Sequence, residues 1–197
     1  DGYINGAEVF IDQNFNFNKD VGELSSVSGS DGSFYIGTND DDLYACLQNR
    51  PIVAYVPIGA IDSSTGEVTN PYGMILPSIN DTGSSSIAIT PFTSLLSEAI
   101  VKAKVQSNIT GDLTIEEGCG SLGGSIANDV SDEITQLMNA IESSFGITIQ
   151  ELVSDYMSGS SNAIINEAKA QKIQIYFPYI LEILDNIDSE LSLKYNK

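Results

Sequence analysis

The residues whose types and spacing could do chemistry lie between positions 12 and 23, a segment called here the Asp/Asn loop. Oxygen-bearing side chains occupy its positions 1, 3, 5, 7, 9 and 12, namely Asp12, Asn14, Asn16, Asn18, Asp20 and Glu23. This is the spacing of a calcium loop, in which a curled backbone turns alternate side chains toward an ion that takes about six to eight oxygens. The sequence therefore predicts a Ca²⁺ site made by these six residues. A metal-free, Asn/Asp-rich hairpin loop is the alternative.

Position six of such a loop is normally glycine, which permits a sharp turn, and here it is Phe17. We expect either a less tight turn or unusual backbone dihedrals at Asn16 or Asn18. Three of the side-chain ligands are neutral amides, which predicts weak affinity, with a dissociation constant of about 10⁻⁴–10⁻³ M. The residues before the loop, Glu8 to Ile11, are typical of a strand, so a helix–loop–helix EF-hand is not expected.

The charge balance of the chain also favours cation binding. The chain has 197 residues with 27 acidic and 8 basic side chains, a formal charge of -19. Nucleic acid and anionic membranes are bound through Lys and Arg, so neither is an expected partner, whereas cations are. A charge of this sign can also serve solubility alone.

Catalytic chemistry has little support in the composition. The chain contains no histidine, which excludes Ser-His-Asp and Cys-His arrangements and the usual zinc sites. A pair of carboxylates acting on a glycoside is compatible with the composition, but no pair stands out among the many acidic residues. We expect no catalytic residues and no enzyme activity.

The two cysteines, Cys46 and Cys119, are the candidate disulfide, which would tie the first half of the chain to the second. Two buried free thiols are the alternative. No stretch approaches the roughly 20 apolar residues that span a bilayer, so membrane insertion is not expected. The chain begins at Asp1 without Met, which suggests a processed chain or a piece of a longer protein.

The pattern of apolar residues changes near position 90. Before it, short apolar runs between turn residues predict strands, and after it apolar residues recur at helical spacing. The predicted strands are Ala7–Ile11, Ser33–Ile36, Pro51–Ile58, Gly73–Leu76 and Ser86–Ile89. The first predicted helix starts at Thr90-Pro91. The other predicted helices are Ile126–Phe145, Thr148–Tyr156 and Asn162–Leu193.

These elements predict an α+β protein. An N-terminal antiparallel β-sandwich over residues 1–90 would be followed by a C-terminal helical bundle over 91–197, packed on it or linked to it. The glycine-rich segment Gly118–Gly124 is either a linker or a packed loop. The acidic run Asp40–Asp42 is expected to be a solvated turn, with a second cation site as the alternative, and the same holds for Asp62 with Glu67.

Three stretches of the first half resemble a known type of module. They are Asp1 to Asn14, the Asp-Val-Gly-Glu run that ends at Glu23, and the Ser-Asp-Gly-Ser-Phe-Tyr-Ile run that ends at Ile36. They are similar to β-sandwich modules of bacterial surface proteins, of the collagen-adhesin B-type, Sdr B-type and carboxypeptidase-regulatory-like families.

Two further segments, Gly59–Glu67 and Ile89–Leu95, look like the marine Gram-negative subgroup of these modules, so the resemblance covers roughly residues 1–105. It implies that Ca²⁺ is held by the same six residues of the Asp/Asn loop. Some of these modules carry a Lys–Asn isopeptide bond. Lys19 is the only lysine before Lys102 and lies in the loop, so we predict no such bond in the β half.

Together these features predict a secreted, calcium-stabilised structural or adhesive protein of the bacterial cell surface. Its expected partners are calcium and either further copies of itself, in an extracellular filament or layer, or other surface proteins. The alternative is a non-catalytic module of a larger surface protein that binds carbohydrate or peptide.

Overall fold

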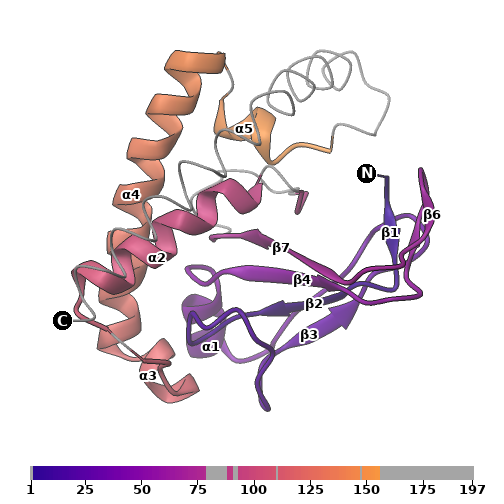
Figure 1. Ribbon diagram of the computed structural model, residues 1–197. Helices are drawn as coiled ribbons and strands as arrows, with labels where there is room; N and C mark the ends of the chain where they lie inside the picture. Colours follow the sequence, from indigo (N-terminus) through magenta and orange to yellow (C-terminus); the bar gives the residue numbers. More distant parts are fainter. Residues whose placement is uncertain (1, 79–87, 91–92, 110, 147, 156–197) are drawn as a thin grey trace.

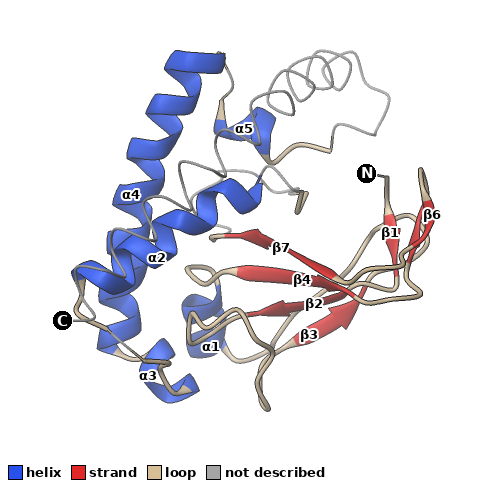
Figure 2. Ribbon diagram, in the orientation of Figure 1, coloured by secondary structure: helices blue, strands red, loops and turns tan. Residues whose placement is uncertain are grey.

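The computed structural model describes residues 2–78, 88–90, 93–109, 111–146 and 148–155. Within them, strands precede helices except for one short helix, and the α+β class predicted from the sequence is confirmed (Figure 2). The strands are β1 (Ile4–Asn5), β2 (Glu8–Ile11), β3 (Ser25–Val27), β4 (Ile52–Val56), β5 (Ile61–Asp62), β6 (Gly66–Glu67) and β7 (Tyr72–Leu76). The helices are α1 (Asp41–Leu47), the 3₁₀ helix η2 (Thr93–Leu96), α2 (Ser97–Gln106), α3 (Ile115–Cys119), α4 (Ser121–Phe145) and α5 (Ile149–Leu152).

The strands form two antiparallel sheets. The larger has the order β3-β2-β4-β7 and the smaller the order β1-β5-β6. β4 lies inside the larger sheet, and its apolar sequence is buried at every position except Tyr55. Such a run of branched side chains suits a strand that is covered on both faces.

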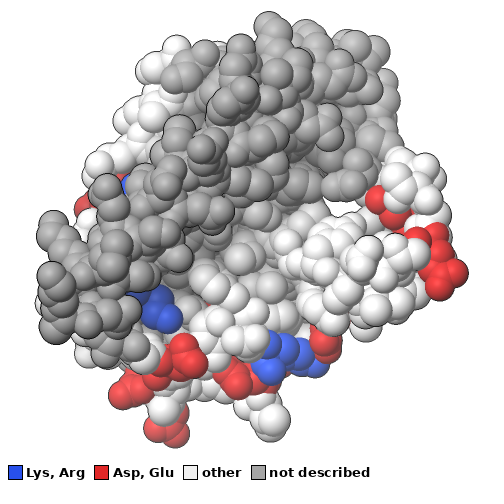
Figure 3. All heavy atoms as spheres, in the orientation of Figure 1, with Lys and Arg blue, Asp and Glu red and all other residues white. Residues whose placement is uncertain are grey.

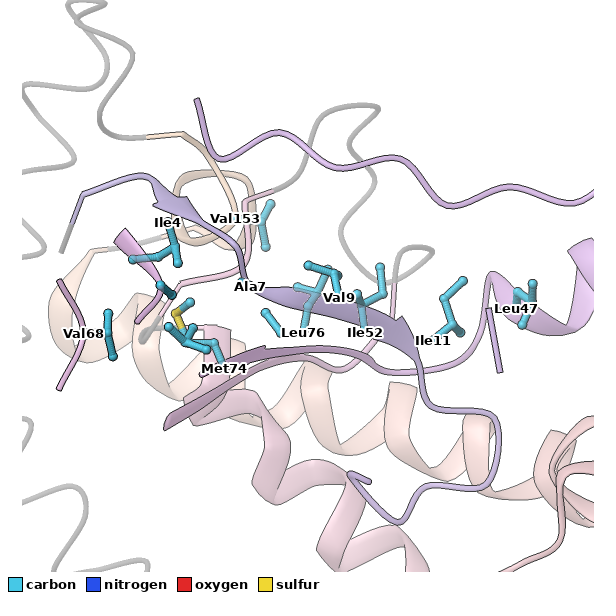
Figure 4. Close-up of a cluster of buried hydrophobic side chains, with 13 residues drawn as sticks. Ile4, Ala7, Val9, Ile11, Leu47, Ile52, Val68, Met74, Leu76 and Val153 are labelled. Atoms are coloured by element: carbon cyan, nitrogen blue, oxygen red, sulfur yellow. The ribbon is translucent and has the colours of Figure 1, made fainter. Parts of the chain in front are cut away.

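Two hydrophobic clusters hold the molecule together. One gathers around the sheets, including Ile4, Val9, Ile52 and Leu76 (Figure 4). The other lies among the helices, where α2 and α4 pack together at one side of the molecule (Figure 1). In α4, the buried hydrophobic side chains recur at a spacing of four and form one stripe that faces the second cluster: Ile126, Val130, Ile134 and Met138.

The structure differs from the sequence prediction in the strand half. Ser33–Ile36 is not a strand, although Phe34 and Ile36 pack against the sheet cluster. The acidic run at 40–42 is not a turn but the start of α1. The Asp40 carboxylate accepts the backbone N–H of Leu43 at 3.0 Å and caps the helix, and the next two acids lie in its first turn, where the helix dipole favours negative charge.

The helices begin and end at local signals. Thr90 and Thr93, the first residue of η2, exchange backbone-to-hydroxyl hydrogen bonds at 3.0 and 3.2 Å. Gly146, with φ 65°, ends α4 as predicted. Thr148 caps α5 through the N–H of Glu151 at 3.3 Å, although that helix ends at Leu152 rather than Tyr156.

The glycine-rich segment at 118–124 is neither a linker nor a loop, because it contains the end of α3 and the first turn of α4. Helix α4 therefore begins five residues before the predicted Ile126. The predicted strand Ser86–Ile89 falls partly outside the described residues, and its described part, 88–89, is not in a strand. The helix predicted over Asn162–Leu193 lies entirely outside them. No helix in the described part of the chain is long and apolar enough to cross a membrane.

Candidate metal centre

The Asp/Asn loop connects β2 to β3 and folds back on itself. The backbone N–H of Asp12 donates to Pro51 O at 2.9 Å, which continues the pairing of β2 with β4 by one residue. At the other end, Ile11 N donates to Leu24 O at 3.1 Å and closes the loop. The sheet therefore fixes both ends of the segment that carries the six predicted ligands.

The first and last predicted ligands organise the backbone between them. The Asp12 carboxylate accepts the N–H groups of Asn16, at 3.2 Å, and Phe17, at 2.8 Å. The Glu23 carboxylate accepts those of Gln13, at 2.8 Å, and Asp20, at 3.0 Å. Both acids are buried, so the loop is a compact, hydrogen-bonded unit.

Three of the remaining predicted ligands converge inside this frame. Asp20 Oδ2 accepts a hydrogen bond from Asn14 Nδ2 at 2.7 Å and another from Asn16 Nδ2 at 2.8 Å. Half a turn about the last side-chain bond of an asparagine exchanges its nitrogen for its oxygen with almost no change of shape. The same three side chains can therefore present three oxygens to a cation in place of the amide–carboxylate bonds.

Asn14 supplies a specific sign that the site is incomplete. Its side chain is only 4% exposed, yet Asn14 Oδ1 has no hydrogen-bond partner among the described residues. A buried acceptor without a donor costs about 1–3 kcal/mol. A cation bound to this oxygen would remove that cost, so the residues present fit a calcium ion.

Asn18 is placed differently from the other five. Its side chain is exposed, and its Nδ2 donates outward to the Asn16 carbonyl at 3.0 Å. Its backbone N–H donates to Asn16 Oδ1 at 2.7 Å. At this position a calcium loop uses the backbone carbonyl, so an outward side chain is compatible with binding.

Carboxylates alone do not make the site. No group of three or more Asp, Glu or Cys side chains that could hold a metal occurs among the described residues. A cation at the Asp/Asn loop would therefore need the amide oxygens of Asn14 and Asn16 as well as the acids. Such a mixed oxygen set suits a hard cation such as Ca²⁺ rather than zinc.

Burial disfavours the charged forms of the first and last acids of the loop. Burial raises the pKa of Asp12, although backbone N–H groups, first that of Phe17 and then that of Asn16, act against the shift. Burial also raises the pKa of Glu23, opposed by two N–H bonds and reinforced by the charges of Asp12 and Asp20. Each carboxylate is thus destabilised in its charged form, and a divalent cation would stabilise it.

The non-glycine residues of the loop with left-handed backbone dihedrals are Phe15, with φ 59°, and Phe17, with φ 63°. The expectation that Asn16 or Asn18 would take the unusual dihedrals is wrong. The reason is packing: the Phe15 ring is 1% exposed inside the helical cluster, and Phe17 packs against the same cluster. Burial of two aromatic rings outweighs the backbone strain of two non-glycine residues.

The sequence did not identify the residues that attach the loop to the helices. The Arg50 guanidinium lies over the Phe15 ring, 5.1 Å from its centroid, and Lys104 Nζ donates to the Phe15 carbonyl at 3.0 Å. Arg50 also donates to the Gly118 carbonyl through Nε, at 3.0 Å, and through Nη2. The one available sequence signal was a pair of large apolar residues, Phe15 and Phe17, inside a polar loop.

Cys46 and Cys119 are joined in a disulfide between α1 and α3, at a sequence separation of 73. The other acidic segments have structural uses. Asp62 Oδ1 accepts the backbone N–H groups of Gly2, Ser64 and Thr65 at 2.7–3.2 Å, and Asp40 caps α1. In the view of Figure 3, the described acidic side chains outnumber the basic ones along the lower edge and the right-hand tip.

Comparison with protein families, curated proteins and solved structures finds no match for this chain.

Proposed function

We propose that this chain is a calcium-stabilised structural or adhesive protein of the outer surface of a bacterial cell. The observation that carries the proposal is the buried, unpartnered Oδ1 of Asn14, a residue whose Nδ2 donates to the carboxylate of Asp20. It lies in a loop whose spacing suits calcium and in which burial disfavours the charged forms of Asp12 and Glu23. With the chain's strong negative charge and its lack of histidine, this supports cation binding rather than catalysis.

An extracellular location is supported by two features. A disulfide is typical of proteins exposed to an oxidising environment, and the chain forms one between Cys46 and Cys119. The neutral amides in the ligand set favour affinity in the range of about 10⁻⁴–10⁻³ M, which suits extracellular modules. Neither nucleic acid nor a membrane is an expected partner.

On this proposal, the two sheets form the β-sandwich expected over residues 1–90 and the later helices form the bundle expected over 91–197. Self-association into a filament or layer, or binding to other surface proteins, would use strand edges. β3 lies at one edge of the larger sheet, and its residue Val27 is exposed. An exposed strand edge is a template for pairing with another chain.

The test is thermal unfolding of the full chain in millimolar calcium, in magnesium and in EGTA. A ligand that binds only the native state raises its stability by mass action. We expect the midpoint to rise with calcium in the unmodified protein. In Asp20→Asn the response should be lost, because the variant removes a charged ligand. The Asp20 carboxylate accepts the side-chain amides of Asn14 and Asn16, so its replacement leaves in place the backbone N–H bonds to the carboxylates of Asp12 and Glu23.

Glu116→Gln is the matched control, since it removes one charge from an exposed position in α3. It should keep the full calcium response. A midpoint that does not respond to calcium in the unmodified protein contradicts the proposal. Light scattering at increasing protein concentration, with and without calcium, tests self-association: a particle size that is independent of concentration argues against a filament or layer.

One observation favours the carbohydrate- or peptide-binding alternative. Tyr55 is 45% exposed, and the strand register places it in a row with Val27, Glu8 and Gly73 across the larger sheet. A tyrosine on a flat sheet face can stack on a sugar ring. A glycan array probed with the unmodified protein and with Tyr55→Ala distinguishes the two: a signal that depends on Tyr55 supports the alternative.

A further inference from the structure

The disulfide lies next to the contacts that attach the Asp/Asn loop to the helices. Cys46 is in the last turn of α1, four residues before Arg50, and Cys119 directly follows Gly118 at the end of α3. Arg50 and Gly118 are hydrogen-bonded to each other through two nitrogens of the guanidinium. The disulfide and this hydrogen-bonded contact therefore close one small unit between the strand half and the helical half.

Both partners in this unit touch the first half of the loop. The Arg50 guanidinium lies 5.1 Å from the centroid of the Phe15 ring. Gly118 lies directly on the loop backbone, because a Cβ placed on it would be 1.9 Å from Gln13 O and 3.2 Å from the Cα of Asn14. Positions two to four of the loop are thus held by residues adjacent to the disulfide.

Helix α3 is five residues long, and Gly118 is its only buried residue. It packs against α4, where Gly123 lies against the Gly118 carbonyl, and its Ile115 lies near Gly22 of the loop. Among the described residues, the disulfide is the only covalent cross-link between α3 and α1. It therefore adds to the two Arg50 hydrogen bonds in holding Gly118 against Gln13.

We propose that the Cys46–Cys119 disulfide controls the calcium affinity of the Asp/Asn loop, so that reduction weakens binding. The inference rests on the proposed function of the loop. A thiol reductant transfers two electrons and two protons to the disulfide, which yields two cysteine thiols and the oxidised, disulfide form of the reductant. Cys119 is exposed to such a reductant. Release of α3 then frees Gly118 from the loop, and calcium must supply the order that α3 supplied before.

The coupling must be reciprocal, because an effect of the disulfide on calcium binding implies an equal effect of calcium on the stability of the disulfide. Calcium should therefore make the disulfide harder to reduce. Couplings of this kind are typically about 5- to 150-fold in affinity, and a contact at one half of the loop suggests the lower part of that range, about tenfold.

The first experiment is a calcium titration by calorimetry of the full oxidised chain, of the chain reduced with excess dithiothreitol, and of Cys46→Ser/Cys119→Ser. We expect the dissociation constant to rise about tenfold in the last two. Glu116→Gln, treated identically, is the control for a substitution in α3 that leaves the disulfide in place. Equal affinities in the oxidised and reduced chains overturn the inference and leave calcium binding itself intact. Absence of binding by the oxidised chain overturns the proposed function instead.

The second experiment does not require a folded variant. The fraction of the disulfide that is reduced at equilibrium in dithiothreitol redox buffers is measured for the unmodified protein by thiol labelling and mass spectrometry, in calcium, in magnesium and in EGTA. We expect the equilibrium constant for reduction to be several-fold lower in calcium than in the other two. Equal constants in all three, in a protein shown by calorimetry to bind calcium, overturn the inference.

Discussion

The guanidinium of Arg50 covers the ring of Phe15, with 5.1 Å between the guanidinium carbon and the ring centroid. Arg50 lies in the segment between α1 and β4, whereas Phe15 belongs to the Asp/Asn loop and is buried among the helices. Burial lowers the pKa of Arg50 to about 10, while the negative charge of Asp12 acts against this shift. The side chain remains cationic at neutral pH, and its buried positive charge interacts favourably with the carboxylate of Asp12.

Arg50→Lys should therefore destabilise the protein although it conserves the charge. A lysine cannot reproduce the two bonds to the Gly118 carbonyl together with the bond from Nη1 to Asn49 O. We expect a loss of about 2–3 kcal/mol in the free energy of unfolding measured in urea. Lys19→Met is the control: it breaks an exposed ion pair with Glu8 and should cost less than about 1 kcal/mol. A tolerated Arg50→Lys would show that the geometry of the guanidinium does not matter.

Replacement of glycine by alanine should change the stability in opposite directions at Gly118 and Gly124. Gly118→Ala places a methyl group against the backbone of Gln13, which cannot move aside as a flexible side chain can. It should destabilise the protein by about 2–4 kcal/mol. A Cβ on Gly124, within α4, meets nothing within 4 Å, so Gly124→Ala should stabilise by about 0.5–1 kcal/mol. Thermal unfolding of both variants checks this, and an unchanged midpoint for Gly118→Ala would contradict the close approach.

Signals that act within a few residues made part of the structure predictable. The spacing of the Asp/Asn loop, the stop at Gly146 and the cap at Thr148 each depend on neighbours along the chain. The acidic run at 40–42 was misread because asparagine and aspartate favour both turns and helix N-termini, and only the structure shows which one the following residues complete. The prediction of a linker or loop at 118–124 is wrong because the glycines there allow close packing of the backbone and do not provide flexibility.

Long-range contacts account for what the sequence could not reveal about the site. Phe15 lies under Arg50 and belongs to a hydrophobic cluster whose other buried members come from Leu96 to Met138, far along the chain. No local sequence pattern predicts these neighbours. This anchoring also explains why the left-handed dihedrals fall on Phe15 and Phe17 instead of the asparagines, which accept such dihedrals more readily. The candidate ligands could be predicted because they are close together in the sequence. The residues that hold the loop in place could not, because they are far from it in the sequence.

Position 17 should reverse the usual order of alanine and glycine. Phe17→Ala and Phe17→Gly both remove the same ring from the helical cluster, but only glycine accepts φ 63° without strain. We expect Phe17→Gly to be more stable than Phe17→Ala by about 1 kcal/mol in urea unfolding. The same pair at Gln136, an exposed position in α4, should show the normal order, with alanine more stable. If alanine wins at both positions, the backbone at 17 is not left-handed in solution.

Asn14→Asp should lower the stability of the calcium-free protein and raise its affinity for calcium. The new carboxylate can no longer donate to Asp20 Oδ2 and repels it instead, so in EGTA the variant should lose about 1–2 kcal/mol of unfolding free energy. An added charged ligand should strengthen calcium binding, by about tenfold in calorimetric titration. Asn70→Asp adds the same charge at an exposed position outside the loop and should change neither quantity appreciably. Weaker calcium binding by Asn14→Asp would exclude Asn14 as a ligand.

The acid side of the stability profile should depend on Asp62. Burial alone would raise the pKa of this carboxyl, but the backbone N–H groups of Ser64, Gly2 and Thr65 outweigh burial and lower it below 3.8. A carboxyl with a lowered pKa in the folded state contributes stability above its unfolded value, and this is lost as the pH falls through the folded value. Asp62→Asn should therefore have a clearly lower free energy of unfolding than the unmodified protein at pH 6, and the difference between the two should become smaller below pH 3.8. Urea unfolding in EGTA across this pH range measures that difference. A difference that stays constant with pH would mean that the three N–H bonds do not favour the charged form of Asp62.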